Sequence, residues 1–154
     1  MSNFAKTYWG IQFLNALNNI DYSNRLPRGR RYAANGAVVS INIDKNIIKA
    51  KVAGTRPSPY NIHITVPKFT DKQKNDIINI IKNKPTLLAE LFNRRLPDEF
   101  LQLANNAGVQ LFPKTWRDFD MKCSCPDWAV PCKHLAAVIY ILASEIDLNP
   151  FKVL

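Results

Sequence analysis

The chain has 154 residues, of which 47% are hydrophobic and 21% are charged, a composition typical of a globular domain and not of a disordered segment. This length can bury a sizeable core without a second domain, and no apolar run approaches the length of a membrane span. The formal net charge of +9 favours an anionic partner such as nucleic acid. Because the sequence shows no secretory signal peptide, we expect a cytoplasmic protein.

A helix and a basic loop are predicted at the start of the chain. Apolar side chains recur at helical spacing over residues 8–20 and predict a helix with one buried face. The side chains expected on that face are Trp9, Phe13, Leu17 and Ile20. The segment 25–36 follows, and its glycines and arginines are typical of a basic loop.

Three strands are predicted next, over residues 38–43, 47–52 and 60–66, with a short turn at 44–46 that makes the first two a hairpin. Alternating side chains would give an antiparallel sheet one apolar, core-facing side and one polar, partly basic side. His63 falls on the polar side and is interpreted as an exposed strand histidine. The residues expected on the apolar side are Val39, Ile41, Ile43, Ile48, Ala50, Val52, Ile62, Ile64 and Val66.

The middle of the chain is helical. Thr70 and Gln73 form a capping-box pattern ahead of one helix, a second helix starts near Thr86, and a third over 98–105 ends at Gly108. Their apolar stripes predict either core or a surface that docks a partner. No glycine-rich phosphate loop and no triad-like grouping occurs in the sequence, so we expect a protein that is not an enzyme.

Together these patterns predict an α+β fold, in which a small antiparallel sheet of about three strands packs with helices. A C-terminal segment rich in cysteine follows and leads into a last helix. We expect one region over 1–112 and a second over 113–154, packed together as one compact unit.

Three thiols and an imidazole gather within twelve residues, at Cys123, Cys125, Cys132 and His134. This is the ligand set of a closed, tetrahedral zinc site, which leaves no open position for catalysis. The second pair precedes a helix, whose N-terminus favours thiolates. The odd number of cysteines disfavours a disulfide framework, whereas a redox pair formed by the C-x-C segment remains an alternative.

The sequence segments CSCPDW and PCKHLAAV resemble the SWIM zinc-finger signature, C-x-C followed by C-x-H. Gly54, Tyr60 and Ile62 resemble the upstream glycine and strand positions of that family, and the segments 8–10 and 28–32 resemble the N-terminal region of bacterial members. The resemblance implies one structural zinc ion and a module that binds DNA or proteins. It also implies association with Swi/Snf-type helicase-like ATPases. Relatives often continue beyond the finger, so two expectations stay open, a fragment of a longer protein or a short member of the family.

The basic residues are concentrated in the first half of the chain. Residues 22–60 contain eight basic side chains and a single acid, whereas residues 101–154 contain five of each sign. We therefore predict that the first half contacts the phosphate backbone and that the finger supports it. Alternatively, the basic residues only solvate an exposed surface. The predicted nucleic-acid contacts are Arg25, Arg28, Arg30, Arg31, Lys49, Lys51 and Arg56.

Two functions fit these observations. The first is a zinc-binding, non-catalytic module that binds nucleic acid, most simply DNA, as an accessory to a helicase-like ATPase. The second is a protein–protein interaction module whose zinc finger is purely structural. A thiol redox protein is a third alternative, and it predicts turnover of thiols without stoichiometric metal.

Overall fold

The computed structural model describes residues 4–15, 25–127 and 130–149 of the chain. Within these ranges, four strands form one antiparallel sheet in the order β1-β2-β3-β4. The strands are β1 (Val38–Asp44), β2 (Ile47–Val52), β3 (Tyr60–Thr65) and β4 (Asp120–Cys123). The α+β fold is therefore confirmed, and the sheet has one strand more than the sequence predicts.

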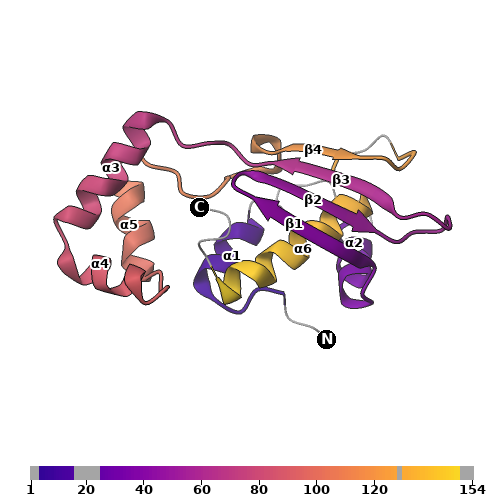
Figure 1. The fold of residues 1–154 in the computed structure, drawn as a ribbon, viewed down its shortest axis with the longest axis horizontal. Helices are drawn as coiled ribbons and strands as arrows, with labels where there is room; N and C mark the ends of the chain where they lie inside the picture. Colours follow the sequence, from indigo (N-terminus) through magenta and orange to yellow (C-terminus); the bar gives the residue numbers. More distant parts are fainter. Residues whose placement is uncertain (1–3, 16–24, 128–129, 150–154) are drawn as a thin grey trace.

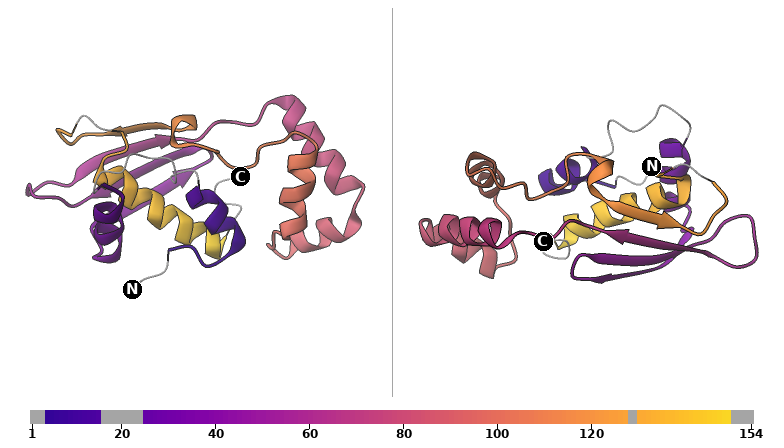
Figure 2. Two further views of the ribbon diagram at one scale, coloured as in Figure 1. Left: turned by 180° about the vertical axis from the view of Figure 1, so that it is seen from behind. Right: turned by 90° about the horizontal axis from the view of Figure 1, so that it is seen from above.

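One group of helices covers one face of the sheet, and a second group lies at one end of the molecule. Figure 1 shows α6 (Lys133–Leu148) running below the sheet, with α1 (Tyr8–Asn15) and α2 (Arg25–Ala34) beside it. Three further helices, α3 (Asp71–Lys82), α4 (Pro85–Phe92) and α5 (Asp98–Asn106), stand together at one end of the molecule (Figure 2). A single 3-10 turn over Trp116–Asp118 precedes β4. Among the described residues, no helix combines the length and apolar character needed to cross a bilayer.

The two central strands show the predicted alternation. Ile48, Ala50 and Val52 of β2 are buried, while Lys49 and Lys51 between them are exposed. The same pattern continues on β3, where the buried side chains are Tyr60, Ile62 and Ile64. Helix α6 packs against this apolar face with most of its length buried, so the core lies between the sheet and α6.

The prediction for the start of β1 is wrong by one residue. The register shifts between Val38 and Ser40, so that Val38 pairs with Val52 and packs on the core. Val39, which was expected on the apolar side, is 56% exposed. A bulge inserts one extra residue into a strand, and this reverses the side on which the neighbouring side chains lie.

The predicted basic loop over 25–36 is also wrong, because most of it is the helix α2. Pro27 lies in the first turn, where a missing N–H costs little. Gly29 faces α6, and a carbon at its Cβ position would lie 3.0 Å from the carbonyl oxygen of Lys133. This glycine therefore permits close contact between two helices. Gly36, with φ of 74°, ends the helix, and the Ala37 amide donates to the carbonyl of Tyr32 at 2.9 Å.

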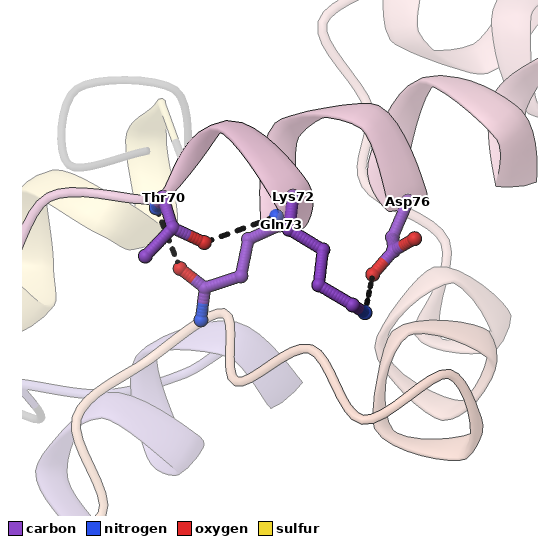
Figure 3. A network of polar contacts seen from close by, with 4 residues as sticks. All are labelled: Thr70, Lys72, Gln73 and Asp76. Atoms are coloured by element: carbon purple, nitrogen blue, oxygen red, sulfur yellow. Dashed lines mark hydrogen bonds and ion pairs between the residues drawn. The ribbon is translucent and has the colours of Figure 1, made fainter.

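The helices α3, α4 and α5 form an insertion between β3 and β4, which are neighbours in the sheet. The predicted capping box is present. The Gln73 amide donates to Thr70 Oγ1 at 3.2 Å, and the Thr70 amide donates to Gln73 Oε1 at 2.8 Å (Figure 3). Trp9 of α1 holds the insertion against the body of the molecule, because its Nε1 donates to the carbonyl of Leu96 at 2.7 Å.

The remaining helices agree with the sequence predictions where they are described. The second and third helices begin at Pro85 and Asp98, and Gly108 has the positive φ expected after a helix end. Trp9 and Phe13 of α1 are buried, whereas the predicted Leu17 and Ile20 lie outside the described residues. The strand β4, from the region 113–154, pairs with β3 from the region 1–112.

Candidate metal centre

The four predicted ligands come from two elements that meet at one end of the sheet. Cys123 is the last residue of β4, and Cys125 follows two residues later. Cys132 is the N-cap of α6, and His134 lies in the first turn of that helix. Their ligand atoms all lie within 4.8 Å of one another. The fold therefore brings together the set that the sequence predicts.

The distances between these atoms fit a single tetrahedral ion. His134 Nδ1 lies 3.9 Å from Cys123 Sγ and 3.9 Å from Cys132 Sγ. With Zn–S of about 2.3 Å and Zn–N of about 2.0 Å, tetrahedral ligands lie roughly 3.5 to 3.8 Å apart. The two His134 distances need to shorten by about 0.4 Å, and the widest separation of the set by about 1 Å, for all four atoms to bind one zinc ion. Three thiolates with one imidazole also form a donor set that suits this borderline-soft cation.

Backbone amides support two of the sulfurs. The Leu135 amide donates to Cys132 Sγ at 3.5 Å, as an N-cap contact, and the Cys125 amide donates to Cys123 Sγ at 3.5 Å. Such bonds, with the positive end of the α6 dipole, stabilise negative charge on sulfur. They would also orient the thiolates of a metal-bound site.

The three thiols of the metal-free site do not ionise independently. A hydrogen bond from Cys123, together with His134 and the Leu135 amide, lowers the pKa of Cys132 to about 4 against the opposing effect of burial. The same contact with Cys132, together with burial, raises the pKa of Cys123, and burial raises the pKa of Cys125. Ionisation of one thiol therefore makes ionisation of a neighbouring thiol less favourable, because two negative charges would lie close together. A bound divalent cation removes this penalty, because it deprotonates its thiol ligands.

Aromatic rings hold the imidazole of His134 in place. Its Nδ1 faces the sulfurs, while its Nε2 is buried without a hydrogen-bond partner among the described residues. The ring of Tyr60 lies over it, with centroids 4.5 Å apart and planes at 34°. The ring of Tyr32 meets it edge-on at 5.4 Å and 86°. We call Tyr32, Tyr60 and the adjacent Gly54 the aromatic clamp.

Gly54 belongs to the clamp because no larger residue fits there. A carbon at its Cβ position would lie 2.9 Å from Cδ2 of Tyr60, still closer to Cε2, and 3.3 Å from His134 Nε2. The sequence indicates Gly54 and Tyr60 only through the family resemblance. Tyr32 gives no such signal beyond its place in the segment 28–32, because its contact depends on how α2 packs against α6.

Arg56, a predicted nucleic-acid contact, supports the clamp from outside. Its guanidinium lies over the ring of Tyr60, 4.2 Å from the centroid. It donates to the carbonyls of Ser58 at 2.9 Å and Pro59 at 3.1 Å, and to Ser124 Oγ at 3.4 Å. This side chain therefore joins the segment before β3 to the loop between Cys123 and Cys125.

The other predicted contacts lie on two separate surfaces. Arg28, Arg30 and Arg31 are exposed on α2, which packs against α6 on the helical side of the sheet. Lys49 and Lys51 are exposed on the opposite face of the sheet. The structure thus does not bring the arginines and the lysines together. Arg25 begins α2, and its side chain lies outside the described residues.

Comparison with known proteins agrees with the site. The chain is 39% identical over 150 residues to the uncharacterized protein Rv2102 of Mycobacterium tuberculosis, an alignment that covers 97% of this chain and 54% of that protein. The chain therefore spans about half the length of this curated relative. No solved structure matches it. Residues 107–143 match the SWIM zinc finger. The chain therefore contains a segment that matches the SWIM zinc finger, and the three cysteines and His134 of that segment are positioned to hold one zinc ion.

Proposed function

We propose that this chain is a non-catalytic module that binds nucleic acid, most simply DNA, and that zinc supports its fold. The observation that carries the proposal is the uncompensated positive charge on its surface. Among the described residues, the exposed lysines and arginines of β2, β4 and α2 form no ion pair with an acid. These residues are Arg28, Arg30, Arg31, Lys49, Lys51 and Lys122.

Zinc would contribute by joining parts of the chain that are distant in sequence. When bound, the ion supplies four covalent-like links between the end of β4 and the start of α6. The protein contributes the orientation of each ligand, through the amides of Cys125 and Leu135 and through the aromatic clamp. A site with four protein ligands has no open position for substrate, and this favours a structural role.

The experiment that tests this function is a salt series with zinc-loaded protein and a short DNA duplex of arbitrary sequence. Phosphate contacts release counterions, so the logarithm of affinity should fall linearly with the logarithm of salt concentration. Single-stranded DNA and duplex RNA of equal length serve as comparison ligands. Absence of measurable binding to any of the three at low salt would contradict the proposal.

A second function, protein interaction, is favoured by exposed apolar side chains on the helical insertion. Phe92 is 80% exposed and Leu88 44% on α4, and Ile78 of α3 is 47% exposed. Apolar surface of this kind often marks a docking site. We propose a helicase-like ATPase as the partner, on the strength of the family resemblance. Salt-insensitive binding of such a purified ATPase, lost on Phe92→Ser, would support this second function.

A further inference from the structure

The open face of the sheet carries a row of basic side chains that crosses three strands. Lys49 of β2 pairs with His63 of β3, and His63 pairs with Lys122 of β4. Lys51 lies on the same face two residues beyond Lys49. The three lysines are exposed and His63 is half-buried. We call Lys49, Lys51, His63 and Lys122 the sheet row.

The spacing of the sheet row suits several adjacent phosphates. Neighbouring strands lie about 4.8 Å apart, so the backbones at Lys49 and Lys122 are separated by roughly 10 Å, and those at Lys49 and Lys51 by roughly 7 Å. Flexible lysine stems can adjust these distances by several ångströms. The acids of this face, Asp44 and Asp120, lie at the two ends of the next cross-strand row, on the side away from Lys51. Positive charge therefore increases toward the metal centre.

This face is open and mainly polar, with Ile47 and the acids Asp44 and Asp120 in the row beyond Lys49. Helices α1, α2 and α6 lie on the other face of the sheet, and no other described element covers the sheet row (Figures 1 and 2). Its outward side chains include lysine, histidine, asparagine, serine and threonine, which bind phosphate oxygens. They include no Phe, Tyr or Trp on which an unpaired base could stack. The chemistry therefore fits the backbone of a duplex better than a single strand.

We propose that the sheet row binds the phosphate backbone of duplex DNA. The inference rests on the proposed function and assigns that function to the open sheet face, whereas the arginines of α2 do not form part of the surface. It also adds His63 and Lys122, which the sequence analysis does not include among the contacts. Binding through phosphates alone supplies affinity without reading base sequence.

Zinc would complete this surface. Lys122 directly precedes the ligand Cys123, and β4 has only four residues. The pairing of β4 with β3 over residues 62–65 holds Lys122 beside His63. A metal that fixes the end of β4 to α6 would therefore keep Lys122 in the row.

The test compares the zinc-loaded wild type with a triple variant, Lys49→Ala, Lys51→Ala and Lys122→Ala. A matched control removes the same charge from the insertion and its linker, where three exposed lysines lie at positions Lys68, Lys74 and Lys82. A third protein carries Arg28→Ala and Arg31→Ala. Zinc content and thermal unfolding are measured for each protein, so that loss of fold is recognised separately from loss of binding.

We expect the sheet triple variant to lose three phosphate contacts, which lowers the salt slope by about 2.7. Its affinity deficit relative to wild type should then shrink about 40-fold as salt rises from about 50 to about 200 mM. The control and the α2 variant should keep slopes close to wild type. The sheet assignment would be overturned if the control variant lost as much salt slope as the sheet triple variant, or if only the α2 variant lost salt slope. The proposed function would stand in either case. Tighter binding of single strands or of duplex RNA would overturn the duplex DNA inference, and no binding by wild type would overturn the proposed function itself.

Discussion

Replacing Gly54 by alanine is expected to weaken zinc binding without changing any ligand. The added methyl carbon would lie 2.9 Å from Cδ2 of Tyr60 and 3.3 Å from Nε2 of His134. Because the φ of Gly54 lies outside the left-handed region, alanine meets no backbone penalty there, and the effect is steric. The ring of Tyr60 must therefore move, and with it the surface on which the imidazole rests.

The free-energy cost of the Gly54→Ala substitution depends on how tightly the ring of Tyr60 is packed. Its side chain is 7% exposed and lies between His134, at 4.5 Å, and the guanidinium of Arg56, at 4.2 Å. Forcing one extra carbon into such packing costs about 1–3 kcal/mol. Disturbing a residue that orients a metal ligand lowers metal affinity about 10- to 100-fold. We expect a fall in zinc affinity within that range.

Zinc affinity is measured by competition with a chromogenic chelator at fixed pH, and stability by thermal unfolding with and without zinc. Gly36→Ala is the matched control. Gly36 has φ of 74° and nothing within 4 Å of its Cβ position, so alanine there adds backbone strain of about 1–2 kcal/mol but no contact with the site. It should lower thermal stability and leave zinc affinity unchanged. Wild-type affinity in the Gly54 variant, or equal losses in both variants, would refute the role of the aromatic clamp.

Three further predictions concern the metal. Cys132→Ser or His134→Ala should abolish zinc retention and lower the unfolding temperature, because metal binding and folding are coupled; a variant that keeps one zinc with unchanged stability would contradict this. Zinc binding near neutral pH should release about two protons, since the pKa values of Cys123 and Cys125 are raised whereas Cys132, with a pKa of about 4, is already a thiolate. Calorimetry in buffers of different ionisation enthalpy counts these protons, and release of none or three would refute the assignment. Finally, zinc removal should lower the affinity for duplex DNA more in wild type than in a Lys122→Ala variant, as measured in the salt series. If zinc removal lowers the affinity of both proteins equally, zinc does not act through Lys122.

The sequence predicts best those features whose signal is local. The ligands of the metal centre lie within twelve residues, and their chemistry alone identifies them. Strands β2 and β3 are predicted well because one face is buried, which imposes strict alternation. The capping box at Thr70 is likewise a local pattern, and the structure confirms both of its hydrogen bonds.

Features that depend on tertiary contacts are not visible in the same way. The four residues of β4 are too few for a periodic signal, and the helical insertion separates them from their partner β3. Gly29 suggests a loop by itself, and only its approach to Ala136 shows that it belongs to a helix contact. The sheet row needs the strand register, which places Lys122 beside His63. Tyr32 likewise reaches the metal centre only because α2 packs against α6.

One bound zinc ion is the central feature of the proposed metal centre, and native mass spectrometry can count it on protein purified without added zinc. Free thiols are counted in the same sample before and after chelation. We predict about one zinc per chain, with thiols that react only after the metal is removed. A metal-free protein with freely reactive thiols, or with a disulfide between Cys123 and Cys125, would contradict the zinc centre and favour the redox alternative.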